Sequence, residues 1–72
     1  MATYIIDCIE AGVRRTLAFS TRKATVEYLK DMQQLPFYLY DMSILHIYYD
    51  GKFVKDGPMS ITEAIDFLEK KD

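Results

Sequence analysis

Residues 45–55 carry the clearest turn signal in the chain, an Asp-Gly pair between two runs of β-branched and aromatic residues. Asp50 and Gly51 accept the positive φ angles of a two-residue type I′ turn, so the two runs are predicted to pair as a β-hairpin. The turn also sets the register. On one face it places Tyr49 opposite Lys52, Ile47 opposite Val54 and Leu45 opposite Asp56, and on the other face Tyr48 opposite Phe53 and His46 opposite Lys55.

A second hairpin is predicted near the start of the chain. Residues 4–10 and 13–19 are rich in residues that favour strands, and Ala11-Gly12 separates them. The face with Tyr4, Ile6 and Cys8 is the more apolar, so it is predicted to point at the core. The other face places Ile9 opposite Arg14, Asp7 opposite Thr16 and Ile5 opposite Ala18.

Each hairpin is followed by a pattern typical of a helix. Ser20 and Thr21 offer an N-cap for a first helix, which is predicted to end before Pro36 because proline disfavours helical geometry in the residue before it. Ser60 and Glu63 form a capping box, in which each side chain accepts a hydrogen bond from the other's backbone amide. Apolar positions then recur with helical spacing at Ile61, Ala64, Ile65 and Leu68.

The order strand, strand, helix thus occurs twice. An ungapped shift of 39 positions superposes Gly12 on Gly51 and Leu29 on Leu68, and it also matches the two helix caps. This match indicates an internal repeat, with residues 1–34 as one copy and residues 43–72 as the other. Because one ββα unit leaves an apolar sheet face uncovered, the two units are predicted to fold together.

The fold class that follows is α+β, a tandem ββα-ββα arrangement in one domain, residues 1–72. Its expected form is a four-stranded antiparallel sheet with two helices on one face. A chain of 72 residues buries only about 60% of the surface that its unfolded form exposes. Its margin of stability is therefore expected to be thin.

Two helices on one sheet face leave the other face uncovered, and that face is predicted to contain exposed apolar and aromatic side chains. Contiguous surface of this kind marks sites of protein binding or self-association. Two structural alternatives stay open: the faces are misassigned by one residue, or the segment around Phe37 folds over them. The predicted residues of this face are Ile5, Ile9, Arg14, Thr16, His46, Tyr48, Phe53 and Lys55.

Residues 35–42 connect the first helix to the second hairpin and are too aromatic for a solvated linker. They are read either as a short extra strand or as an ordered loop. Tyrosine and methionine are enriched in protein interfaces, so this segment is a second candidate for protein binding. If it is an edge strand, it can also pair with a partner's strand. The candidate residues here are Phe37, Tyr38, Tyr40 and Met42.

A single-stranded nucleic acid is the alternative ligand for the uncovered face. Tyr48 and Phe53 could stack on unpaired bases, with Arg14, His46 and Lys55 as flanking cations. The net charge of −2 disfavours this alternative, because neutralisation of the phosphate backbone dominates such binding. Arg14, Arg15, Arg22 and Lys23 form a basic group read as a solvated surface, or as a footprint for an acidic partner or a phosphate.

Cys8 and His46 are the only cysteine and the only histidine. One cysteine excludes an intramolecular disulfide, and the pair falls short of a zinc site, so no metal or cofactor is expected. Arg15 is predicted to lie beside Cys8 and could activate the thiol, but a buried, inert cysteine is the more common case. His46 has no predicted carboxylate or nucleophile beside it, so no catalytic residue and no enzymatic activity are expected.

The N-terminal residues lack the basic region and apolar core of a signal peptide, and no apolar run is long enough to span a bilayer. A cytoplasmic location is therefore expected. By analogy of size and fold with small proteins of bacteria and their phages, the expected function is a non-catalytic protein-binding module. It would act as a regulator or inhibitor that docks on a larger protein, and a homodimer is a further expectation.

Overall fold

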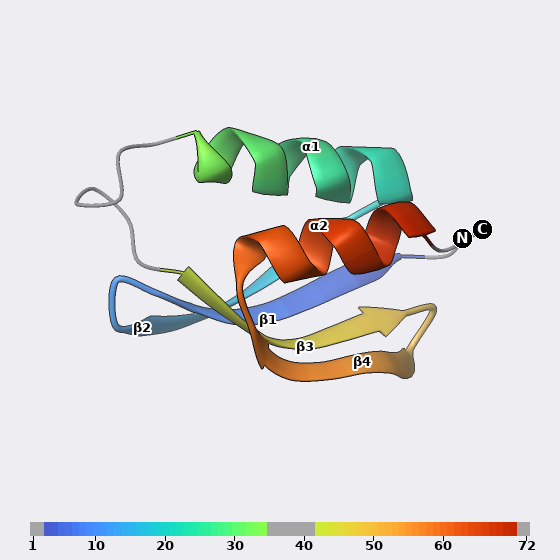
Figure 1. Ribbon diagram of the computed structural model, residues 1–72. Coiled ribbons are helices and arrows are strands. Elements are labelled where there is room, and N and C mark those ends of the chain that lie inside the picture. Colours follow the sequence, from blue (N-terminus) through green and yellow to red (C-terminus); the bar gives the residue numbers. More distant parts are fainter. Residues whose placement is uncertain (1–2, 35–41, 71–72) are drawn as a thin grey trace.

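The computed structural model describes residues 3–34 and 42–70 and shows an α+β fold in the predicted element order (Figure 1). Each of the two helices follows a pair of strands, as the sequence predicts. Neither helix in the described ranges has the length and apolar character needed to cross a membrane. The elements are β1 (Tyr4–Glu10), β2 (Val13–Phe19), α1 (Arg22–Gln33), β3 (Met42–Tyr49), β4 (Lys52–Met59) and α2 (Ile61–Lys70).

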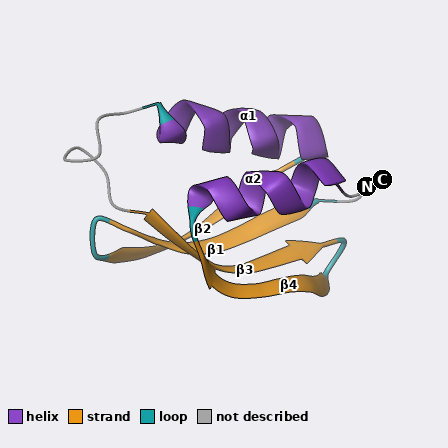
Figure 2. Cartoon of the chain, in the orientation of Figure 1, coloured by secondary structure: helices purple, strands orange, loops and turns teal. Residues whose placement is uncertain are grey.

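The four strands form one open antiparallel sheet in the order β2-β1-β3-β4. The first strand of each hairpin is therefore central, and the second strand of each lies at an edge. Both helices cover the same face of this sheet (Figure 2), and they contact each other above it. Within residues 3–34 and 42–70, no helix lies on the opposite face.

The first hairpin has the predicted register. Tyr4 pairs with Phe19, Ile6 with Leu17 and Cys8 with Arg15, without a shift along the whole of β1 and β2. Ala11 and Gly12 have φ angles of 51° and 82°, as a type I′ turn requires. Along β1, residues Tyr4, Ile6 and Cys8 are buried beneath the helices, which confirms the predicted core face.

The second hairpin follows the predicted register only next to its turn. Tyr49 pairs with Lys52 and Tyr48 with Phe53, as predicted, but Ile47 then pairs with Lys55 rather than with Val54. His46 pairs with Asp56 rather than with Lys55. The predicted pairs beyond Phe53 are therefore wrong, because an irregularity in β4 displaces the register by one residue.

A second irregularity in β3 changes which side chains reach the core. The register of β3 shifts between Ile44 and His46 against β4, and a matching shift separates Asp7 from Cys8 on β1. Leu45 was predicted to point to the core, but Ile44 is fully buried there and Leu45 is only half-buried. A β-bulge of this kind adds one residue to a strand and reverses the alternation of its side chains.

Both helices begin where their caps predict. Thr21 is the N-cap of α1, and its Oγ1 accepts a hydrogen bond from the amide of Ala24 at 3.0 Å. Ser60 and Glu63 each accept a hydrogen bond from the other's backbone amide, at 3.1 and 3.0 Å, which confirms the capping box of α2. These bonds satisfy amides that the first turn of a helix cannot pair internally.

The core lies between the helices and the sheet. Its fully buried residues include Leu29 of α1 and Leu68 of α2, with Ile6, Ile44 and Ile47 from the sheet. Thr25 is also fully buried, since its hydroxyl donates to the carbonyl of Thr21 at 2.8 Å and so leaves only its methyl group for packing. The core thus draws on both ββα units.

Two contacts join residues that are 39 positions apart, the shift that relates the two halves in sequence. Asp7 and His46 are paired at the junction of β1 and β3. Lys30 and Glu69 form an ion pair between α1 and α2, with Nζ 2.9 Å from Oε2. Matched positions meet in this way when two similar units are related by a twofold axis that passes through both contacts. The internal repeat itself stays a prediction.

Candidate functional site

The helix-free side of the sheet, called the open face below, is the main candidate site. Side chains alternate along a strand, so the residues of β1 that alternate with its core residues lie here, together with their partners on β2 and β3. In β4, Phe53 lies on this side by its predicted pairing with Tyr48, and the displaced register beyond it brings Asp56 to the same side. The open face contains Ile5, Asp7, Ile9, Arg14, Thr16, Ala18, His46, Tyr48, Phe53 and Asp56.

Three rings gather on the open face where β3 and β4 meet. The rings of Tyr48 and Phe53 are 5.6 Å apart and nearly perpendicular, at 87°. The ring centre of His46 lies 5.4 Å from that of Phe53 and 6.1 Å from that of Tyr48. Ile5 of β1 pairs with Tyr48 of β3. Phe53 has 53% of its surface exposed. We call these four residues the aromatic patch.

A charged pair lies beside the aromatic patch. The guanidinium of Arg14 donates to both carboxylate oxygens of Asp7, from Nε at 3.2 Å and from Nη2 at 2.7 Å. Asp7 is 8% exposed, whereas the side chain of Arg14 is largely in solvent. The hydrogen bond from Arg14 is the main reason why the pKa of Asp7 is lowered, and it outweighs the opposing effect of burial. Arg14 is therefore neutralised within the protein.

His46 lies between two carboxylates rather than beside a lysine. Its backbone pairs with Asp7 on one side and with Asp56 on the other. Its Nδ1 atom is 3.1 Å from Oδ1 of Asp56, within ion-pair distance, although the two atoms lack the alignment of a hydrogen bond. The sequence places Asp56 on the opposite face, and this expectation is wrong because of the register shift in β4.

Lys55 is the clearest correction to the predicted site. The register shift turns it to the helix-covered side, where its Nζ lies 5.6 Å from the ring centre of Phe67 in α2. A cation over an aromatic face is favourable, and it holds this lysine away from the open face. Of the three cations predicted to bind nucleic acid, one is thus on the wrong side of the sheet, and Arg14 is already paired.

The structure brings together some of the residues predicted to bind a protein and separates others. Ile5, Tyr48 and Phe53 are contiguous in the aromatic patch, and Ile9 lies farther along β1 beside Arg14. Met42 was predicted to be part of a surface segment, but it is buried in the core at the start of β3. Phe37, Tyr38 and Tyr40 lie outside the described residues.

Two acidic residues of the open face were not among the predicted site residues. Asp7 is assigned to this face by the hairpin register. Arg14, its diagonal neighbour on β2, is a signal for an ion pair that sequence reasoning could have used. Asp56 carries no such signal, because only the irregularity of β4 brings it beside His46. Together these two carboxylates make the rim of the aromatic patch less basic than predicted.

Cys8 has the inert surroundings expected of a core cysteine. Its thiol is fully buried, and burial raises its pKa, with Glu10 acting in the same direction. Arg15 lies beside Cys8 as predicted, but its guanidinium forms an ion pair with Glu10. The thiolate is thus disfavoured at neutral pH, and an activated thiol is not supported.

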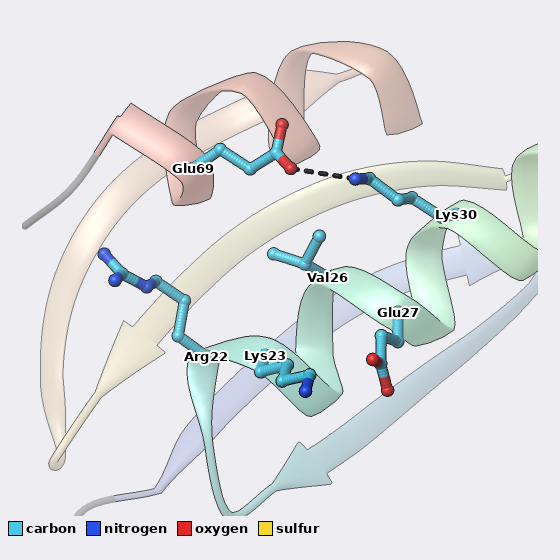
Figure 3. A pocket seen from close by; sticks show the side chains of 6 residues that line it. All are labelled: Arg22, Lys23, Val26, Glu27, Lys30 and Glu69. Carbon is cyan, nitrogen blue, oxygen red and sulfur yellow. Dashed lines mark hydrogen bonds and ion pairs between the residues drawn. The ribbon is translucent and has the colours of Figure 1, made fainter.

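An open groove of about 560 Å³ lies between the two helices on the other side of the molecule (Figure 3). Val26 points into it, and the ion pair between Lys30 and Glu69 crosses it. Its remaining lining residues are Arg22, Lys23 and Glu27. The basic group predicted from the sequence is therefore divided: Arg22 and Lys23 lie at this groove among carboxylates, whereas Arg14 and Arg15 are paired on the sheet.

The residues that the structure describes contain no cluster of three or more histidine, cysteine or acidic side chains able to hold a metal ion. Comparison with protein-family models, with curated proteins and with solved structures gives no match for this chain. Its function has to be argued from the open face itself.

Proposed function

We propose that this chain is a non-catalytic protein-binding module that docks on a larger protein through the aromatic patch of its open face. In this role it acts as a regulator or inhibitor of that protein. The observation that carries the proposal is Phe53, a phenylalanine 53% exposed on the open face of the edge strand β4. Tyr48, His46 and Ile5 extend the apolar surface around it.

The composition of the patch and its rim supports a protein as the ligand. Interfaces between proteins combine an aromatic, apolar centre with a polar rim, and a few aromatic residues supply most of the binding energy. Here the rim consists of Asp7, Arg14 and Asp56, of which the first two already neutralise each other. A partner that covers the patch therefore has few unpaired charges to desolvate.

The same observations weigh against a single-stranded nucleic acid. Binding of such a ligand depends on cations that neutralise its phosphates. Lys55 lies on the helix-covered side, and Arg14 is engaged by Asp7. His46 lies between two carboxylates. The aromatic rings suited to stacking are present, but the cations that should accompany them are turned away or paired.

The test is a double substitution at the patch, Tyr48→Ser with Phe53→Ser. The tagged native chain captures its partner from cells of its source, and mass spectrometry identifies the captured protein. The purified pair is then measured by calorimetry. We expect the double variant to bind at least about tenfold more weakly, since truncated anchors at an interface typically cost more than 1 kcal/mol each.

Lys52→Ser is the matched control. Lys52 precedes Phe53 in the chain, but its side chain lies on the opposite face of the sheet. This variant should bind like the native chain, and circular dichroism should show all three proteins folded. Equal binding by the double variant would refute the proposal. So would salt-sensitive retention of the native chain on single-stranded DNA or RNA that the double variant loses.

A further inference from the structure

The two edges of the sheet differ in how well they are protected against further strand pairing. The edge strand β4 contains Pro58, which has no amide to donate, and two register shifts interrupt its pairing with β3. Proline and bulges are the usual means by which an edge is blocked. The edge strand β2 has seven residues, no proline and an unbroken register with β1. In the described part of the chain, no strand pairs with its outer side.

The turn at Ala11-Gly12 determines which backbone groups of β2 point outward. In a two-residue hairpin the residues that flank the turn exchange hydrogen bonds, here Glu10 and Val13. Every second residue from Val13 onward therefore directs its amide and carbonyl groups to β1. The intervening residues direct theirs to the open edge. These are Arg14, Thr16 and Ala18.

The two arginines of β2 do not shield this edge. Charged side chains often protect an edge strand because they resist burial by an incoming strand. Arg14 instead leans toward β1, where it binds Asp7, and Arg15 likewise binds Glu10 of β1. Both guanidinium groups are drawn over the sheet, so the outward backbone groups of β2 stay accessible.

We propose that β2 is the self-association site of this protein, at which two copies pair antiparallel about a twofold axis at Thr16. This register pairs all seven residues of β2 and joins the two sheets into one of eight strands. Thr16 faces Thr16 of the partner subunit, a pairing found to be favourable across strands. Arg14 faces Ala18 of the partner subunit, so no like charges are directly opposed.

The helix-covered side of the same edge supports a second copy as the occupant. Val13 is 61% exposed, and Phe19 and Tyr28, whose rings are 5.3 Å apart, are only partly buried. The register centred on Thr16 places Val13 opposite Phe19 of the partner subunit. Each copy thus covers the exposed Val13 of the other with an apolar side chain. An unrelated strand would not ensure an apolar residue at this position.

This inference goes beyond the proposed function, because the edge of β2 and the aromatic patch are separate surfaces. Antiparallel pairing keeps the open faces of both copies on the same side of the joined sheet. The dimer would present two aromatic patches to one partner assembly. Loss of dimer formation and loss of partner binding are then independent results, since each has its own variant.

The first measurement is the mass of the native chain by sedimentation equilibrium over a range of concentrations. We expect a concentration-dependent rise toward twice the 8.4 kDa of one chain. Thr16→Pro removes an outward amide without breaking a bond to β1, so it should abolish the dimer and stay folded. Thr16→Val keeps the amide and should still dimerise. A native chain that is monomeric at every concentration would overturn the proposal.

Cysteine crosslinking tests the register and does not depend on the proline variant. Thr16→Cys places two thiols on the axis with their Cα atoms about 5.5 Å apart, within the range that a disulfide spans. Diamide, which oxidises two thiols to a disulfide, should convert this variant to a covalent dimer. Ala18→Cys is the control, because its copies lie roughly 14 Å apart in this register. Equal crosslinking of both variants, or of neither, would contradict the assignment; Cys8 is buried and does not compete.

Discussion

Asp7 is a carboxylate held on the surface of a sheet chiefly by one arginine. Its two oxygens accept from the fork of the Arg14 guanidinium, the geometry that makes an arginine–carboxylate pair strong and specific. Neighbouring side chains leave only 8% of Asp7 exposed, although it lies on the open face. A partly covered charge of this kind stabilises a fold only as long as its partner is present.

The pH dependence of stability should report this pair. The pKa of Asp7 is lower in the folded than in the unfolded protein. Its contribution to the free energy of unfolding is therefore complete above the ordinary pKa of aspartate, about 4. It is lost as the pH falls through the folded value. We expect Asp7→Asn to unfold at a lower urea concentration than the native chain at pH 7. The two midpoints should converge in strong acid.

Asp66→Asn is the control for this comparison. Asp66 forms an ion pair with Lys70 one helical turn away, at 2.9 Å, but both side chains are exposed. Exposed pairs contribute little, so this variant should match the native chain at both pH values. A midpoint difference for Asp7→Asn that stays constant down to strong acid would show that the ion pair is not its cause.

At the level of elements, the irregular pairing of β3 with β4 has the largest consequences. It turns Lys55 to the helix side, brings Asp56 to the open face and buries Ile44 in place of Leu45. Gly57 of β4 lies close against the backbone of β3. A Cβ atom on this residue would collide with the carbonyl oxygen of Ile44 and would lie 3.0 Å from that of Leu45. Only glycine fits at this position.

Gly57→Ala should therefore destabilise the protein by about 1–3 kcal/mol, the usual cost of forcing a methyl group into occupied space. Chemical denaturation gives this value directly. Gly51→Asn is the comparison: Gly51 has a φ of 77° that asparagine tolerates, and nothing lies within 4 Å of its added Cβ. The left-handed φ still strains any side chain, so a loss of up to about 1 kcal/mol is expected there, less than at Gly57. If both variants lose the same free energy, close approach at Gly57 is not the reason.

At the level of the whole molecule, one core serves both ββα units. Leu29 and Leu68 are fully buried on different helices, and the helices contact each other as well as the sheet. A domain of 72 residues has a total stability of roughly 4–11 kcal/mol. Neither unit can therefore lose much packing without the other unfolding too.

Leu29→Ala and Leu68→Ala test this shared core. Each should cost about 2–5 kcal/mol, since a buried leucine leaves a cavity that its surroundings only partly fill. Thermal unfolding followed by near-ultraviolet and far-ultraviolet circular dichroism should give one coincident, lowered transition for each variant. Lys23→Ala, on the exposed side of α1, should leave the transition in place. Separate transitions for the two signals would mean that the units fold independently.

The order of the elements, both turns, both helix caps and the core face of the first hairpin could all be predicted from the sequence. These features depend on local rules. A type I′ turn needs two residues that tolerate positive φ, and a cap needs an oxygen within reach of the first turn. Most of the aromatic patch could be predicted for the same reason. Tyr48 and Phe53 form the pair next to the one that flanks the turn, where the turn still sets the register.

The strand order, the bulges and the side on which Lys55, Asp56 and Met42 lie depend instead on contacts between elements that are distant in the chain. Gly57 is the nearest local signal, because a lone glycine within a strand suggests a bulge or a close backbone approach, but it does not say where the register shifts. One added residue reverses every later side chain in the strand. The hairpin of residues 45–55 was therefore predictable near its turn, but the charges of the open face followed from packing several residues away.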